Sequence, residues 1–128
     1  MKSRFFSFAL AALFCQMSFA QQVITKQADN TEVVNTTEIA KDVKGYKAQT
    51  PVEIYIKKGK VVKVAVLPNR EGPKYMKMVS EGILSKWNGL KLATAMNLKV
   101  DAVTGATYTS NAIIDNVKRG LKYYIEQK

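Results

Sequence analysis

The sequence contains no histidine, and its single cysteine, Cys15, lies within an apolar N-terminal segment. If that segment is removed on export, the remaining chain has neither residue. Their absence excludes disulfides, haem ligation by histidine, thiolate chemistry and most zinc sites. We therefore predict no metal site, and a redox role for this chain would have to rest on an organic cofactor.

Acidic residues are also few. The sequence has 10 aspartates and glutamates and 20 lysines and arginines, which gives a formal net charge of +10. Such a surplus could attract nucleic acid, an anionic membrane or acidic proteins. The lysines are dispersed and no nucleic-acid motif accompanies them, so we expect no nucleic-acid partner. Peripheral membrane contact and acidic redox proteins stay open as partners. The length of 128 residues and the apolar fraction of 47% indicate one small domain.

Residues 1–20 have the features of a secretory signal peptide. Lys2 and Arg4 supply a basic start, residues 5–14 are almost wholly apolar, and Ser-Phe-Ala at 18–20 is a small-x-small cleavage site. The apolar run is shorter than the about 20 residues of a membrane span. One alternative is that this segment is a hydrophobic N-terminal helix of the fold. Another is that the signal segment is not cleaved and stays as a membrane anchor. We expect cleavage after Ala20 and a periplasmic or otherwise extracytoplasmic location.

Hydrophobic alternation predicts a β-hairpin in the middle of the chain. Residues 52–56 and 61–67 form its strands, with a turn at Gly59 and with Val62, Val64 and Val66 on one face. Residues 21–44 are expected to be an N-terminal arm, for which a weak hairpin and a mobile segment are equally compatible.

Two amphipathic segments, 74–87 and 109–127, predict helices. The predicted buried positions of the first are Tyr75, Met78, Val79, Gly82, Ile83 and Trp87. Those of the second are Ile113, Val117, Leu121 and Tyr124. The segment 90–100 is expected to be a loop with one or two short strands. This order predicts a single α+β domain after the signal peptide, with helices packed on an antiparallel, hairpin-based sheet.

The most informative stretch runs from Asp101 to Ser110 and reads DAVTGATYTS. It places an acid, a glycine and four serine or threonine hydroxyls just before a predicted helix. Backbone N–H groups at a helix start, together with the helix dipole, favour a bound phosphate. We expect Tyr108, Thr109 and Ser110 to offer their N–H groups to phosphate oxygens. The alternative is that Thr109 or Ser110 only caps the helix.

Five positions of this run, Asp101, Thr104, Gly105, Ala106 and Thr107, resemble the motif Asp-x-x-Ser/Thr-Gly-Ala-Thr. It is the acceptor motif of the bacterial FMN-binding domain, found in small flavin subunits of the sodium-pumping NADH:quinone oxidoreductase and its Rnf-type relatives. The resemblance covers residues 45–128 and implies the same α+β order. It also implies FMN bound covalently to Thr107 through a phosphoester, supplied from FAD by an FAD:protein FMN transferase.

The resemblance assigns roles to the neighbouring residues as well. Gly105 and Ala106 keep the approach to the threonine uncrowded, and Asp101 orients the loop or helps to bind the transferase. One departure is that a Glu-Thr-Pro run common in the family reads Glu-Gly-Pro here, at residues 71–73. Gly72 therefore cannot supply a hydroxyl to the flavin, whereas Asn69, Glu71 and Pro73 could still shape the flavin pocket.

The sequence thus predicts an exported flavoprotein that acts as an electron-transfer carrier between membrane or extracytoplasmic redox proteins, with no catalytic residues of its own. One alternative is a small extracytoplasmic flavin reductase, and another is a cofactor-free basic binding module. Lys57, Lys58 and Lys60 cluster at the predicted hairpin turn. They could steer acidic redox partners, or they could be an ordinary solvated surface.

Overall fold

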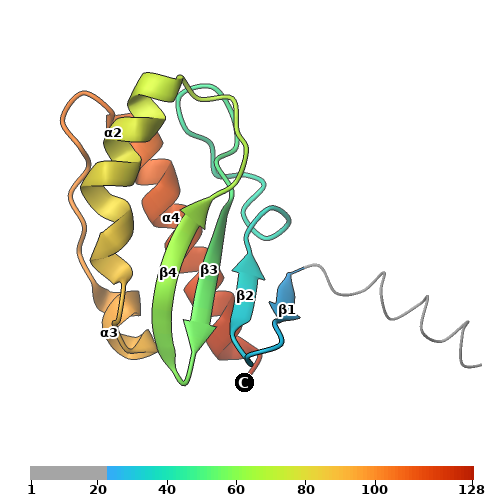
Figure 1. Ribbon diagram of the computed structural model, residues 1–128. Coiled ribbons are helices and arrows are strands. Elements are labelled where there is room, and N and C mark those ends of the chain that lie inside the picture. The colour runs from blue at the N-terminus through green and yellow to red at the C-terminus, as the bar shows by residue number, and fades with distance from the viewer. Residues whose placement is uncertain (1–22) are drawn as a thin grey trace, which may run out of the picture.

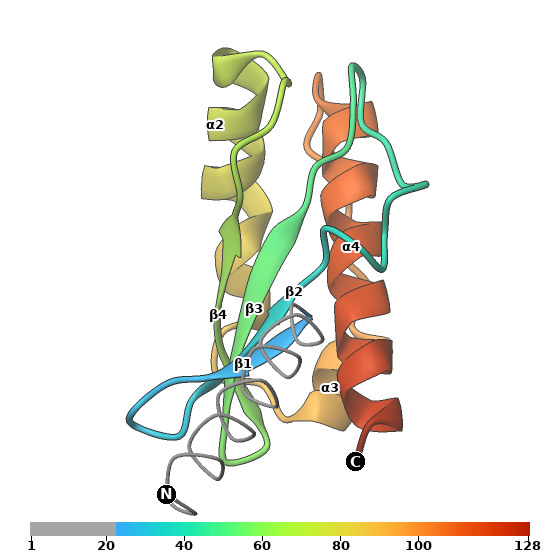
Figure 2. The same cartoon turned by 90° about the vertical axis from the view of Figure 1, so that its right-hand side faces the viewer.

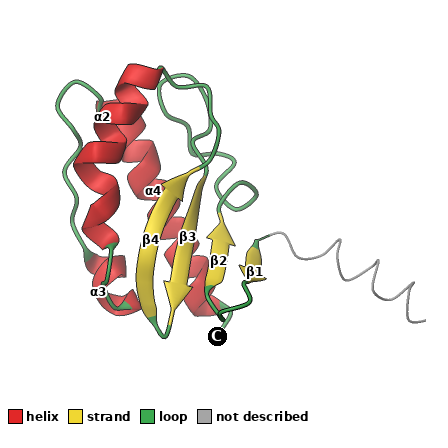
Figure 3. Ribbon diagram, in the orientation of Figure 1, coloured by secondary structure: helices red, strands yellow, loops and turns green. Residues whose placement is uncertain are grey.

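The computed structural model describes residues 23–128, so the predicted signal peptide and its cleavage site lie outside the described residues. A four-stranded antiparallel sheet in the order β1-β2-β3-β4 packs with helices (Figures 1 and 3). The strands are β1 (Ile24–Lys26), β2 (Glu32–Asn35), β3 (Val52–Lys57) and β4 (Lys60–Val66). The helices are α2 (Pro73–Ile83), the 3-10 helix η1 (Leu84–Trp87), α3 (Leu92–Asn97) and α4 (Thr107–Glu126). The predicted α+β class is confirmed.

The N-terminal arm forms the hairpin that was one of its two alternatives. β1 pairs with β2, and β2 pairs in turn with β3. In the turn between β1 and β2, the Asp29 carboxylate accepts a hydrogen bond from the Thr31 N–H at 3.0 Å. The part of the arm from Ile24 to Asn35 is therefore a hairpin of the sheet. Within residues 23–128, no helix is long and apolar enough to cross a membrane.

The predicted hairpin of β3 and β4 is confirmed, but it contains a β-bulge. Tyr55 pairs with Lys63, whereas its neighbour Ile56 pairs with Val61. Val62 is therefore an extra residue without a partner on β3, and it shifts the alternation of β4. Val61 and Val64 are buried and Val62 is 46% exposed, so the prediction that Val62 shares a face with Val64 is wrong.

The long helix α4 supplies one wall of the core, and it runs behind β2 and β3 in the view of Figure 1. Its predicted buried positions, Ile113, Val117, Leu121 and Tyr124, are all buried. They join one cluster with the inward side chains of β2, β3 and β4. Figure 2, turned by 90°, shows α4 on one side of the strands and α2 beside β4.

The predicted helix 74–87 is divided into α2 and η1, and its first turn departs from the expected pattern. Val79, Ile83 and Trp87 are buried as predicted. Tyr75 is 47% exposed, so its assignment to the buried face is wrong. Tyr75 is exposed because it lies in the first turn of α2, which extends beyond the end of the sheet (Figure 1).

The segment expected to be loop and short strands forms α3 instead. Its sequence, LATAMN, is rich in alanine, leucine and methionine, which are strong helix formers. The Leu92 N–H donates to the Gly59 carbonyl at 3.1 Å, which fixes the start of the segment against the β3–β4 turn. An isolated bridge between Lys60 and Lys91 is the strand-like feature found there.

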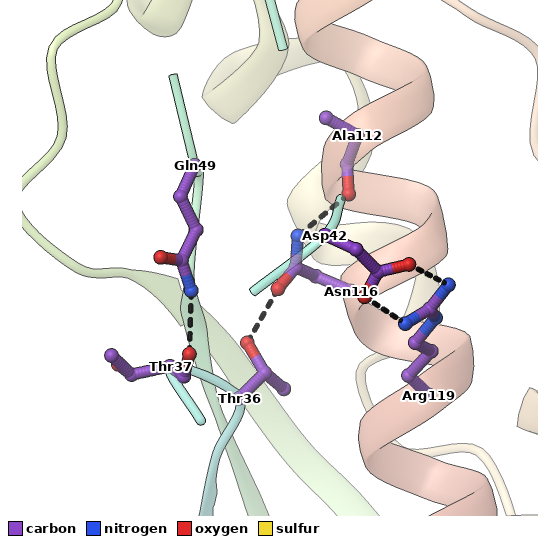
Figure 4. Close-up of polar contacts among 7 residues, drawn as sticks. All are labelled: Thr36, Thr37, Asp42, Gln49, Ala112, Asn116 and Arg119. Carbon is purple, nitrogen blue, oxygen red and sulfur yellow. Dashed lines mark hydrogen bonds and ion pairs between the residues drawn. The ribbon is translucent and has the colours of Figure 1, made fainter. Parts of the chain in front are cut away.

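A polar network ties the long β2–β3 loop to α4 (Figure 4). The buried Thr36 hydroxyl donates to the Asn116 side-chain oxygen at 2.6 Å, and the Asn116 amide donates to the Ala112 carbonyl at 2.9 Å. Farther along the helix, Arg119 forms a two-pronged ion pair with Asp42, with Nη2 2.8 Å from Oδ2. The loop is thereby anchored at several points along α4, on its way to the functional site.

Candidate functional site

A partly open pocket of about 320 Å³ lies at the end of the molecule where α2 and α4 both begin. Three segments that are distant in sequence meet there, namely the β2–β3 loop, the start of α2 and the start of α4. The lining residues are Tyr46, Lys47, Glu71, Gly72, Tyr75, Gly105, Ala106, Thr107, Tyr108 and Thr109. The volume falls within the range of about 300–1,000 Å³ that is usual for small-molecule sites.

The Thr-Gly pair of the motif forms a tight turn in front of α4. The Ala106 N–H donates to the Val103 carbonyl at 2.9 Å and closes the turn over Thr104 and Gly105. Gly105 has φ +88°, which suits the third position of a type II turn and favours glycine. The Ser110 hydroxyl accepts the Val103 N–H at 3.0 Å. The turn is therefore fixed to the helix that follows it.

Helix α4 begins at Thr107, two residues earlier than predicted. Ala106 is the N-cap residue and makes no side-chain cap hydrogen bond, so neither Thr109 nor Ser110 serves as the cap. The first helical hydrogen bond runs from the Ser110 N–H to the Ala106 carbonyl at 2.9 Å. The Ser110 N–H is thus engaged, whereas the N–H groups of Thr107, Tyr108 and Thr109 precede the first helical bond and can meet an anion.

The structure gathers most, but not all, of the motif at the pocket. Residues 105–109 line it, and Thr107 is exposed at its edge. Asp101 and Thr104 are exposed on the preceding loop and do not line the pocket. Asp101 forms no ion pair with another residue of the described chain. Ser110 is fully buried and holds the turn.

Glu71 organises the pocket through hydrogen bonds that the sequence analysis did not foresee. Its side chain is only 7% exposed. One carboxylate oxygen accepts the Tyr46 N–H at 2.6 Å and the Thr109 hydroxyl at 2.8 Å. The other accepts the N–H groups of Lys47 and Ala48, at 2.7 and 3.3 Å. A single carboxylate therefore joins the β2–β3 loop to the first turn of α4.

These hydrogen bonds control the ionisation of Glu71. Burial by itself would raise the pKa of the carboxyl group, but the four donors outweigh that effect, and the pKa is lowered. The carboxylate is therefore ionised at neutral pH. Gly45 makes room for it, because a Cβ atom at this position would collide with a Glu71 carboxylate oxygen. The pairing of Gly45 with an acid so far along the chain leaves no local sequence signal.

Basic residues lie at the pocket and next to its lining segments in the sequence. Lys47 lines the pocket, and Arg70 and Lys74 are exposed on either side of its Glu-Gly-Pro segment. None of the three forms an ion pair with another residue of the described chain. Together with the start of the 20-residue helix α4, they favour an anionic group at this end.

The departure from the family's Glu-Thr-Pro run has a structural counterpart. Gly72 is the N-cap residue of α2, and a Cβ atom there would lie 3.1 Å from the Tyr75 ring. Tyr75 therefore stands beside the space that a side chain at position 72 would take. Gly72 and the Tyr75 ring both line this wall of the pocket.

Comparison with protein-family models matches residues 45–122, more than half of the chain, to the FMN-binding domain. The matched segment includes all the residues that line the pocket. No curated protein and no solved structure matches at a significant level.

Proposed function

Because the chain belongs to the FMN-binding domain family, we propose that it carries FMN covalently on Thr107 and works as an exported electron-transfer flavoprotein. Family membership supports flavin binding. The covalent bond, the carrier role and export go beyond it. The observation that carries the proposal is the position of Thr107, an exposed residue that begins α4 and lines the pocket.

The residues of the pocket fit FMN. Aromatic side chains from three segments, Tyr46, Tyr75 and Tyr108, suit a flat ring system, and the volume is that of a small-molecule site. The N–H groups at the start of α4 and the nearby Lys47 suit a phosphate. When bound, FMN would supply the electron-transfer chemistry, and the chain would supply position and charge.

Attachment would use the Thr107 hydroxyl as the nucleophile. Its oxygen would bond to the FMN phosphorus of FAD, the bond to the adenylate half would break, and AMP would leave. Glu71 is held by four hydrogen bonds and is unsuited to take the hydroxyl proton. We therefore assign proton removal to the FAD:protein FMN transferase. The exposed Asp101 is available as a contact for that enzyme.

The position of the lysines bears on how redox partners would approach. The β3–β4 turn with Lys58 and Lys60 lies at the end of the molecule opposite the pocket (Figure 1). These lysines therefore stand far from a flavin on Thr107. The basic residues Lys47, Arg70 and Lys74, which lie at or near the pocket, are better placed to attract an acidic redox protein.

Co-production with an FAD:protein FMN transferase tests this function. We expect a yellow protein whose intact mass exceeds that of the unmodified chain by one FMN minus one water. Chemical reduction should bleach the flavin reversibly, without sustained turnover of a small quinone or organic acid. Sustained turnover would favour the reductase alternative, and a colourless, unmodified protein would favour the cofactor-free binding module.

Export is tested by sequencing the N-terminus of the protein recovered from the extracytoplasmic fraction. We expect Gln21 as the first residue, because the small residues at 18 and 20 suit a signal peptidase. Ala20→Tyr should block this cleavage, since the bulky ring does not fit the site, while a conservative Ala20→Ser should retain it. An intact N-terminus in the cytoplasmic fraction of the wild type would contradict the proposal.

A further inference from the structure

Two strongly exposed tyrosines stand together at the pocket mouth. Tyr46 is 74% exposed and Tyr108 is 69% exposed, and both line the pocket. Their ring centroids are 6.2 Å apart, and the ring planes are inclined by 42°. Aromatic rings usually bury much of their surface, so exposed rings gathered at a pocket mark a surface for a ligand or partner.

The positions of both rings depend on the same atom. The Glu71 oxygen that accepts the Tyr46 N–H also accepts the hydroxyl of Thr109, the residue after Tyr108. The backbone segments that carry the two rings are therefore held at a fixed separation before any ligand arrives. Such preorganisation lowers the entropy cost of binding.

We infer that Tyr46 and Tyr108 form the surface against which the flavin ring system packs, an inference that rests on the proposed attachment to Thr107. Thr107 directly precedes Tyr108 in the first turn of α4, so a flavin tethered there starts beside this ring. The two rings belong to different segments, and together they present one continuous aromatic surface.

The spacing decides on which side the flavin lies. A ring held between the two phenols would need about 7–8 Å, because each stacked contact takes about 3.5–4.0 Å. The observed 6.2 Å is too short for that arrangement. The flavin ring therefore packs on one side of the pair, facing the pocket that both tyrosines line.

Flavin fluorescence provides the test, because a phenol in contact with an excited flavin donates an electron to it and quenches its emission. Phenylalanine keeps the shape of the ring but is a poor donor. We expect Tyr46→Phe and Tyr108→Phe each to raise the emission and lifetime of attached FMN in part. The double variant should raise both severalfold. Intact mass spectrometry ensures that equally loaded proteins are compared.

Tyr55→Phe is the matched control, because Tyr55 lies on β3, donates to Glu53 at 3.0 Å and does not line the pocket. It should leave the emission unchanged. Unchanged emission in the double variant would overturn the inference. If Tyr75→Phe relieved the quenching and neither Tyr46→Phe nor Tyr108→Phe did, the inference would also be overturned, because the flavin ring would then lie against α2. Failure of any FMN to attach to the folded wild type would instead reject the proposed function.

Discussion

Thr107→Ala protein co-produced with the transferase is expected to carry no covalent flavin and to fold like the wild type. The substitution removes the nucleophilic oxygen from an exposed position. It should change the free energy of unfolding by no more than about 0.5 kcal/mol, because Thr107 is not the helix cap and alanine is a good helix former. Intact mass and visible absorption measure the flavin, and urea denaturation measures the stability.

A second substitution at Thr107 and one at Thr109 serve as controls for this result. Thr107→Ser keeps a hydroxyl at the same place, primary instead of secondary, and should retain covalent flavin. Thr109→Ala removes a hydrogen bond to Glu71 but should also retain it. Asp101→Ala should slow modification if this residue helps to bind the transferase. A flavin-bearing peptide modified at Thr104 or Thr109 would show that the attachment site is assigned wrongly.

Glu71→Gln should have the largest effect on stability, lowering the free energy of unfolding by about 2–4 kcal/mol at pH 7. The glutamine amide has only one oxygen that can accept hydrogen bonds. Its NH₂ group would therefore face donors that are bonded to the second carboxylate oxygen in the wild type. The donors are those of Tyr46, Lys47, Ala48 and Thr109. Denaturation by urea at pH 7 provides the measurement.

The same variant should be less sensitive to acid. The pKa of Glu71 is lowered in the folded protein, whereas an unfolded glutamate titrates near about 4.3. Its stabilisation is therefore fully present above about pH 4.3 and is lost as the pH falls through the lowered folded pKa. Asp29, Glu32 and Asp42 also have lowered pKa values and contribute equally to both proteins, so the difference isolates Glu71.

Gly45→Ala offers an independent check, because it crowds the Glu71 carboxylate without removing it. It should destabilise the fold and raise the emission of attached FMN, since the Tyr46 ring would lose its fixed position. If Glu71→Gln proved as stable as the wild type at pH 7, with the same loss of stability in acid, the organising role of Glu71 would be disproved.

Local sequence patterns were sufficient where the physical cause was local. The alternation of β3 and the buried positions of α4 follow from the periods of strand and helix, and both were predicted correctly. The bulge at Val62 was not predicted, because it depends on pairing with another strand. The helix α3 was missed although its composition favours one, because the segment is short.

For the candidate site, too, the sequence revealed local features and missed long-range contacts. The motif located Thr107 and the glycine turn, since these residues are adjacent in sequence. Neither the motif nor the loop sequence revealed the hydrogen bonds of Glu71, which reach 25 residues back to Tyr46 and 38 residues forward to Thr109. The start of α4 was placed too late because contacts with Glu71 and Val103, rather than a cap, occupy the hydroxyls of Thr109 and Ser110.

The bulge at Val62 also bears on how this chain avoids association with its own copies. β4 is an edge strand, and an open edge can pair with another unfolded or partly folded molecule. Here the bulge interrupts the edge, and Val61 is bonded to Leu90 and Gly89 through its N–H and carbonyl, at 2.8 and 2.7 Å. At the other edge β1 has only three residues. The sheet therefore offers a second molecule little continuous backbone on which to start an aggregate.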